Sequence, residues 1–246
     1  MISLGELTSP IRLTWTLEAI VDTALCVGAG GSTGSLSDKP IIRNAQGQLV
    51  IPGSQLKGRL RHECEKLARG LGWWIPDSPL AEHLYLDDRP EGSPAAVPES
   101  LQVPYRVENY PGYHCWVSQI FGDPILPSRI LVDDLICPYS QDELPEISRP
   151  GVSINRSRQT AEDQKLFYLE TSPMGVGLPF TGEIHVLQHC PPHAEPLLLT
   201  AIAHIHALGG GKSGGLGWLH WSQRPMLDSS GSINWSTMSC PHPAAS

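Results

Sequence analysis

Residues 51–61 read Ile-Pro-Gly-Ser-Gln-Leu-Lys-Gly-Arg-Leu-Arg and open the most regular apolar pattern of the chain. From Gln55 to Gly70, apolar residues recur every three or four positions, which places them on one face of a helix. These residues are Leu56, Leu60, Cys64, Leu67 and, one position beyond, Leu71. Ser54 is a natural N-cap, and Gly70 suits the C-terminal end of a helix. The pattern therefore predicts an amphipathic helix that begins after Ser54.

The start of this helix carries two cations one turn apart, Lys57 and Arg61. Free backbone N–H groups at a helix N-terminus attract anions, and nearby cations add to that attraction. Ser54, Lys57 and Arg61 are therefore candidates for binding consecutive phosphates. An ordinary capped surface helix is the alternative interpretation of the same residues.

Further elements follow on both sides of this helix. Four apolar or alternating segments are predicted as strands: Ile11–Leu25, Arg129–Ile136, Phe180–Leu187 and Leu216–Trp221. A second helix is predicted from Pro196, at an N1 position, to an end at Gly209. The order strand, helix, strand, strand, helix, strand predicts an α+β fold of the ferredoxin-like or RRM-like kind, with long insertions.

Three segments fall outside this pattern. Residues 72–113 are crowded with Pro, Gly and acidic side chains, which is typical of an insertion built from loops and turns. Residues 151–175 are polar and weakly periodic, and we interpret them as a projecting hairpin. Residues 223–246 are rich in Ser and Pro and are expected to form a loosely ordered tail. The length and a hydrophobic content of 40% support a substantial core in one large domain or in two small ones, and we expect residues 1–222 to form a single domain.

The formal net charge of −8 argues against a protein that binds nucleic acid through a generally basic surface. The charge is unevenly distributed, because residues 39–69 carry seven basic side chains and two acidic ones. A local basic surface is therefore compatible with the composition.

Residues 1–10 contain no basic stretch followed by an apolar one, and nowhere do eighteen uncharged apolar residues run together. We therefore expect a cytoplasmic protein with no membrane segment. The six cysteines are scattered through a chain with no export signal, so reduced thiols are expected rather than disulfides.

Two catalytic patterns occur without the context that they require. Gly211-Lys212-Ser213 resembles the end of a phosphate-binding P-loop, but His206 stands where that motif needs its first glycine. Residues 30–34 and 211–215 fit the nucleophile elbow of serine hydrolases, yet neither segment leads into a predicted helix. Both patterns arise easily in glycine-rich loops, so neither an NTPase nor a serine hydrolase is predicted.

Residue types that bind zinc occur at His62-Glu63-Cys64, at His114-Cys115, and at His189-Cys190 with His193. No pair of Cys-x-x-Cys knuckles accompanies them. Buried thiols and surface imidazoles are the preferred interpretation, and a zinc site is the alternative.

Four further motifs follow one another along the chain. The first joins residues 37–43, Ser-Asp-Lys-Pro-Ile-Ile-Arg, to residues 51–58 and Arg61. The second is Ile-Phe-Gly-Asp-Pro at 120–124, after Cys115; the third is Gly-Val-Ser-Ile-Asn-Arg at 151–156, running on to Ala161, Leu166, Phe167 and Glu170. The fourth is the glycine-rich segment 208–217. Together they resemble the RAMP superfamily, and specifically the backbone subunits of type III CRISPR effector complexes.

The resemblance implies a modified RRM-like fold in which residues 151–175 form a thumb hairpin. It implies that such subunits stack head to tail along a CRISPR RNA, beside other effector subunits, while the guide pairs with a complementary target RNA. Sequence would then be read by base pairing and not by side chains. The residues expected to contact RNA are Ser54, Lys57, Arg61, Arg156, Arg158, Gly210, Gly211, Lys212 and Ser213.

The resemblance also implies a catalytic residue. In subunits of this family that cut, an aspartate in the loop after the first strand cleaves the target with a divalent metal, and Asp38 matches that position. The expected cofactor is Mg²⁺ or Mn²⁺, and the expected reaction is in-line attack by the neighbouring 2′-hydroxyl.

Two other functions fit the same residues. Asp38 is alternatively a turn residue ahead of Pro40 in a non-catalytic structural or capping subunit. In a third interpretation the chain processes precursor CRISPR RNA through a histidine and without a metal. His204 and His206 lie on the predicted apolar helix, where core or surface imidazoles are the preferred interpretation of both.

Overall fold

The protein is described by a computed structural model that covers residues 10–28, 40–73, 75, 115–124, 126–191 and 193–225. Most of the expected insertion, most of the tail, and Asp38 lie outside these described residues. The described chain is a mixed α+β structure, as its sequence predicts, with a larger antiparallel sheet and a separate two-stranded one.

The larger sheet is built around β1 (Ile11–Val21), which pairs with β7 (Leu178–Leu187) on one side and β8 (Leu219–Gln223) on the other. Beyond β7 lie β4 (Leu135–Ile136) and β2 (Val50–Ile51), and β3 (Ile130–Val132) also pairs with β7. The order is β2-β4-β7-β1-β8, and every pairing is antiparallel. Two segments far apart in the sequence, β1 and β7, thus form the centre of the sheet.

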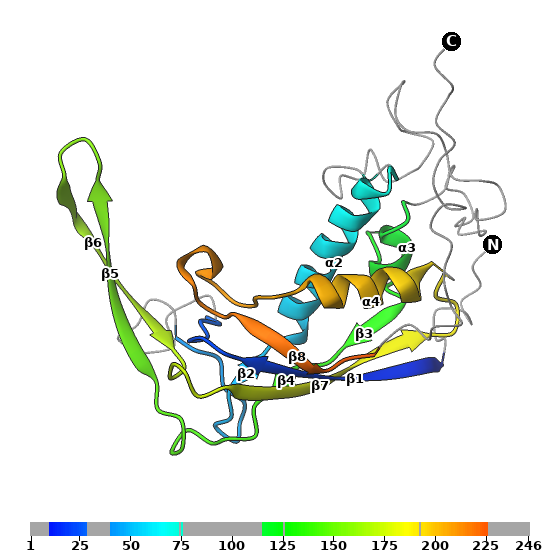
Figure 1. Cartoon of the computed structure of the whole chain (residues 1–246), viewed down its shortest axis with the longest axis horizontal. Coiled ribbons are helices and arrows are strands. Elements are labelled where there is room, and N and C mark those ends of the chain that lie inside the picture. Colours follow the sequence, from blue (N-terminus) through cyan, green and yellow to red (C-terminus); the bar gives the residue numbers. More distant parts are fainter. Residues whose placement is uncertain are drawn as a thin grey trace, which may run out of the picture.

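Helices cover one face of this sheet (Figure 1). They are α2 (Gly53–Gly70), α3 (Ser118–Phe121) and α4 (Ala194–His204). Alternate residues of β1, from Trp15 to Val21, are buried toward them. Leu56 and Leu60 of α2 and Ile202 of α4 are likewise fully buried in the shared core. The intervening residues Thr14 and Thr16 are exposed on the opposite face, which no α-helix of the described chain covers.

A long hairpin projects from the sheet (Figure 1). Its strands are β5 (Ile147–Asn155) and β6 (Thr160–Thr171), paired antiparallel from Ile147 opposite Thr171 to Asn155 opposite Thr160. The hairpin therefore begins four residues before the sequence suggests.

The start of α2 differs from the prediction that Ser54 caps it. The helix begins at Gly53 with Pro52 at the N-cap, and Ser54 is exposed in the first turn. The backbone N–H of Gly53 donates instead to Asp134 Oδ1 at 2.7 Å. A carboxylate remote in sequence thus takes the role that local sequence assigns to Ser54.

The second helix also differs from its predicted bounds. It begins at Ala194, two residues before Pro196, and ends at His204 instead of running to Gly209. After His204 the chain is extended: Ala207 forms a β-bridge with Trp218, and Leu208 N–H donates to Gly217 O at 2.9 Å. Ala207 and Leu208 continue the apolar pattern of the helix, but they lie outside it because they pair with residues 218 and 217.

No helix among the described residues is long and apolar enough to cross a membrane.

Candidate nucleic-acid interface

Residues 24–28, which follow β1, contact three other segments of the chain, and we call them the junction. The glycine-rich segment 208–217 docks on it through two backbone hydrogen bonds. Gly210 N–H donates to Cys26 O at 2.7 Å, and Gly217 N–H donates to Ala24 O at 2.9 Å. The loop is therefore held against the junction by its own main chain.

Glycine is required at two positions of this loop. Gly209 has a φ of 90°, and a Cβ there would lie 2.6 Å from Cys26 O. Gly217 has a φ of 68°, and its Cβ would lie 1.8 Å from Leu208 O. Both the left-handed conformation and the close approach exclude a side chain.

The tip of the loop is open to solvent. Gly210, Gly211 and Ser213 are exposed, so backbone groups and one hydroxyl face outward. The Lys212 ammonium donates to Gly209 O at 3.0 Å, which ties the cation to its own loop. A phosphate approaching this tip would meet main chain first.

The base of the hairpin meets the same junction. Leu25 N–H donates to Ser172 Oγ at 2.9 Å, and Ser172 N–H donates to Leu25 O at 3.0 Å. Ser172 directly follows β6, so these bonds fix where the hairpin leaves the sheet. Both partners are buried.

Both ends of the segment that carries Asp38 also lie here. Gly28 forms a β-bridge with Ile41, and Ile42 N–H donates to Val27 O at 3.0 Å. Ile41 N–H donates to Glu170 Oε2, near the end of β6, at 3.0 Å. The structure thus gathers the glycine-rich loop, the hairpin base and the two anchors of the 29–39 segment.

The cations of α2 have internal partners. Lys57 Nζ donates to Ser128 Oγ at 2.8 Å, and burial, with the nearby Arg61 charge, lowers the pKa of Lys57. Arg61 donates to Gly122 O at 3.0 Å and pairs with Glu65 at 3.0 Å. Both side chains therefore tether the segment from Gly122 to Ser128, and either would have to exchange these contacts to bind a phosphate.

The cations of the hairpin tip are arranged differently. Asn155 Oδ1 accepts hydrogen bonds from the backbone N–H groups of Ser157 and Arg158, both at 3.1 Å, which shapes the turn. Gln159, at a φ of 56°, completes it. Arg156 and Arg158 are exposed, and neither forms an ion pair within the described chain. The hairpin carries them away from the sheet (Figure 1).

The predicted RNA contacts thus lie in three places: the start of α2, the glycine-rich loop and the hairpin tip. Asp38 lies outside the described residues. The histidine and cysteine pairs considered for zinc diverge where they are described, because His62 is exposed while Cys64 is fully buried. His193 is buried against Trp116, 4.8 Å between ring centroids, and burial lowers its pKa to about 4.

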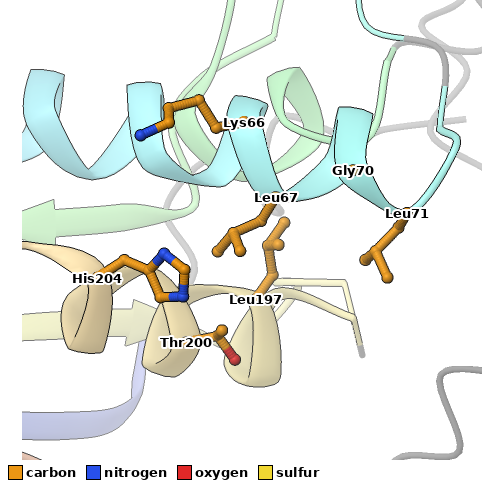
Figure 2. Close-up of a pocket in the computed structure, with 7 residues that line it drawn as sticks. All are labelled: Lys66, Leu67, Gly70, Leu71, Leu197, Thr200 and His204. Atoms are coloured by element: carbon orange, nitrogen blue, oxygen red, sulfur yellow. The ribbon is translucent and has the colours of Figure 1, made fainter.

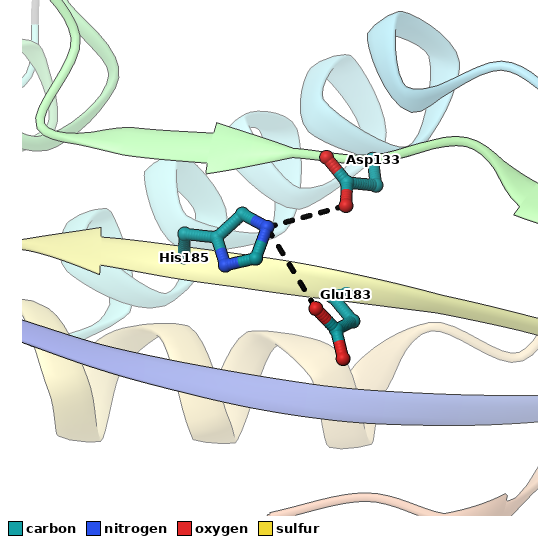
Figure 3. A group of neighbouring side chains, drawn as sticks. All are labelled: Asp133, Glu183 and His185. Carbon is teal, nitrogen blue, oxygen red and sulfur yellow. Dashed lines mark hydrogen bonds and ion pairs between the residues drawn. The ribbon is translucent and has the colours of Figure 1, made fainter. Parts of the chain in front are cut away.

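Two features were not predicted from the sequence. An apolar pocket of about 590 Å³ lies between α2 and α4, lined by residues that include Leu67, Leu71, Leu197 and His204 (Figure 2). On the open face of the sheet, Asp133, Glu183 and His185 form one cluster (Figure 3). Glu183 and His185 share a strand face, which alternation alone indicates; Asp133 joins them only through strand pairing.

The described chain is thus an α+β protein with an antiparallel sheet, helices on one face, a docked glycine-rich loop and a projecting hairpin. The model of the RAMP superfamily matches residues 18–220, and the chain belongs to this superfamily. Its fold is similar to a chain in the cryo-EM structure of the type III-B Cmr-beta bound to cognate target RNA. That likeness has a TM-score of 0.53 at 14% sequence identity, and it covers 86% of this chain and 59% of that chain. No curated protein matches the sequence.

Proposed function

We propose that this chain is a backbone subunit of a type III CRISPR effector complex, which binds CRISPR RNA beside other effector subunits, similar RAMP subunits among them. Membership in the RAMP superfamily supports the proposal. So does the likeness to a chain of the type III-B Cmr-beta bound to cognate target RNA. The complementary target RNA would be recognised by base pairing with the guide, so the protein needs no base-specific contacts with it.

The junction at residues 24–28 is the observation that carries this proposal. It joins the glycine-rich loop, through Gly210 and Gly217, to the hairpin base at Ser172 and to both anchors of the 29–39 segment. An RNA strand crossing the exposed loop tip would therefore pass close to the hairpin and to the segment that carries Asp38. Close backbone approach to phosphate is what exposed glycines permit.

The body is proposed to be a modified ferredoxin-like fold. If β3 and β4 are counted as one interrupted strand, the connectivity is β1, α2, β3/β4, β7, α4, β8. The corresponding spatial order is β8-β1-β7-β4, with β3 also on β7. The β5–β6 hairpin then acts as a thumb that wedges between guide and target, with Arg156 and Arg158 contacting phosphates.

Asp38 is proposed to cut the target. It lies three residues before Ile41, which is bonded to Glu170 of the hairpin. Three extended residues span at most about 11 Å between Cα atoms, which bounds the distance of the Asp38 backbone from that anchor. An RNA kinked by the hairpin would present its backbone within this range.

The proposed reaction is attack of a target 2′-hydroxyl on the adjacent phosphorus, with departure of the 5′-oxygen and formation of a 2′,3′-cyclic phosphate. Asp38 would hold the proton or a Mg²⁺ or Mn²⁺ ion, and such an ion supplies charge stabilisation to phosphoryl oxygens. Its carboxylate then acts in the transition state and adds little to RNA binding.

The test is an effector complex assembled with its guide and partner subunits, carrying Asp38→Ala in every copy of this chain. With a labelled complementary RNA we expect cleavage to fall by about a hundredfold or more while guide and target binding stay near wild type. Ser37→Ala, one residue away, is the matched control and should leave the rate nearly unchanged.

Two outcomes would replace the proposal. Cleavage that continues at every site in the Asp38→Ala complex would make this subunit a structural or capping one. Cleavage of precursor CRISPR RNA that persists in EDTA would favour a metal-independent processing enzyme, for which the exposed His204 and His206 would be the first residues to replace.

A further inference from the structure

Three side chains with metal-binding atoms meet on the open face of the sheet. Glu183 and His185 are two residues apart in β7, so both project from the same face. Asp133 follows β3, and its backbone N–H donates to Glu183 O at 2.9 Å, which places it opposite Glu183. Strand pairing thus fixes the backbones of all three residues (Figure 3).

The three ligand atoms lie close enough together to be drawn onto one ion. His185 Nε2 lies 3.2 Å from Asp133 Oδ2 and 3.9 Å from Glu183 Oε2, and all three donor atoms lie within 4.8 Å of one another. Nitrogen and oxygen ligands about 2.1 Å from a tetrahedral ion are about 3.4 Å apart. The separation of His185 Nε2 from Asp133 Oδ2 is already close to this value, and both carboxylates are exposed and free to change rotamer.

The imidazole is oriented by a neighbouring strand. His185 Nδ1 lies 2.9 Å from Thr14 Oγ1 of β1, so the hydroxyl engages one ring nitrogen while Nε2 faces the carboxylates. A hydrogen bond to the second nitrogen is the usual support of a metal-binding histidine. The His185 side chain is only 16% exposed, whereas those of Asp133 and Glu183 are 54% and 45% exposed. An ion held here would keep coordination positions open to solvent.

The charges at this place are unbalanced. Neither Asp133 nor Glu183 pairs with a lysine or arginine of the described chain. Asp134, the next residue, also lines the shallow hollow beside Glu183, but its carboxylate accepts a hydrogen bond from Gly53 N–H and does not belong to the cluster. Like charges this close repel, and a divalent cation between them removes the repulsion.

We propose that Asp133, Glu183 and His185 bind one first-row divalent cation, of the class of Mn²⁺ or Zn²⁺. A mixed imidazole and carboxylate donor set suits these ions, whereas Mg²⁺ prefers oxygen ligands and retains its water. The site does not contain Asp38 and does not depend on RNA cleavage. It joins β3 to β7 and leaves open positions that face solvent.

The experiment measures Mn²⁺ bound by the full-length chain after treatment with a chelator, from the loss of the free-ion EPR signal. We expect one equivalent in the wild type that excess Mg²⁺ does not displace. His185→Ala, Asp133→Asn and Glu183→Gln should each weaken binding at that equivalent more than about tenfold, and Thr14→Val by about tenfold through the imidazole orientation.

The matched control is His220→Ala. His220 Nδ1 lies 2.9 Å from Asp22 Oδ2 on the same sheet, but no third donor joins this pair among the described residues. Its replacement should leave Mn²⁺ binding unchanged. Circular dichroism and a melting curve establish that each variant is folded. Unchanged binding in folded Glu183→Gln and His185→Ala, or no bound Mn²⁺ in the wild type, would overturn the proposal.

Discussion

The body of the molecule, meaning the larger sheet with α2, α3 and α4, and the β5–β6 hairpin use their side chains in opposite ways. In the body, Lys57 and Arg61 donate to Ser128 and to Gly122. In the hairpin, Arg156 and Arg158 are exposed at the tip. These two cations of the body hold other segments of the fold, while the two arginines at the hairpin tip are available to a ligand.

The apolar residues follow the same division. Leu56 and Phe180 of the body are fully buried, but Ile154 and Leu166 of the hairpin are 62% and 57% exposed. A two-stranded ribbon has no second layer to cover its faces, so it gains little stability from apolar side chains. The exposed apolar residues of the hairpin therefore contribute little to the core and are open to contacts outside the chain. Substitutions in the body should therefore lower the free energy of unfolding, whereas substitutions at the hairpin tip should leave it nearly unchanged.

The largest effect is expected at Gly217 in the body. Gly217→Ala places a Cβ 1.8 Å from Leu208 O at a φ of 68°, so we expect a loss of more than about 3 kcal/mol in the free energy of unfolding. Chemical denaturation measures it. Gly214→Ala, where nothing lies within 4 Å of the new Cβ, is the control and should stay within about 0.5 kcal/mol of wild type. Equal stabilities would mean that the loop is not held as described.

His193 should make the body sensitive to acid. Burial lowers its pKa from 6.5 to about 4, so the unfolded chain binds a proton at a higher pH than the folded one. Its stabilising contribution is therefore complete above pH 6.5 and is lost as the pH falls toward about 4. The loss reaches up to about 3 kcal/mol.

Urea unfolding at several pH values between 4 and 7 measures this dependence. His193→Phe should flatten it, whereas replacing the exposed His62 by Ala should not. A dependence that is the same in the wild type and in His193→Phe would assign the acid sensitivity to other groups.

A smaller loss is expected for Lys57→Ala with Arg61→Ala. The two tethers to the Gly122–Ser128 segment should together contribute about 1 to 2 kcal/mol, because each is a hydrogen bond from a partly buried cation. A thermal melt measures the change. If both cations also contact RNA, the salt dependence of binding flattens as well. If the melting temperature is unchanged while the salt dependence of RNA binding flattens, Lys57 and Arg61 serve RNA binding and not the stability of the body.

The smallest effect on stability is expected for Arg156→Ala with Arg158→Ala, within about 0.5 kcal/mol, because both residues are exposed. Their effect should appear in RNA binding. The log–log dependence of affinity on salt should flatten by about 1.4, at about 0.7 per phosphate contact for a single strand. Binding to a fluorescent guide RNA in the assembled complex measures it, and an unchanged slope would move the RNA to another surface.

Local patterns predicted most of the elements but not their ends. The period of apolar residues located α2, and alternation located β1 and β7. The predicted end of α4 was wrong because residues 207 and 208 continue a helical pattern but pair with residues 218 and 217. The prediction that Ser54 caps α2 was wrong because Asp134, which is remote in sequence, accepts the hydrogen bond from Gly53 N–H at the start of the helix.

The candidate interface was predicted as residue types and not as an arrangement. Glycines at 209–217 indicate close backbone approach, yet nothing in their spacing names Cys26 as the group approached. Lys57 and Arg61 are cations at a helix start in any structure. Only the structure shows that these two side chains hold the segment from Gly122 to Ser128 and are not free charges at the surface.

The sequence by itself determined the α+β class, the central helix and the glycine-rich loop, because hydrophobic period and backbone freedom are properties of neighbouring residues. Tertiary structure decided which groups meet: Gly210 with Cys26, Ser172 with Leu25, and Asp133 with His185. These pairs are separated by more than fifty positions, and their contacts depend on strand register. Register is set by burial of the whole sheet against its helices, a physical condition that no short stretch of sequence contains.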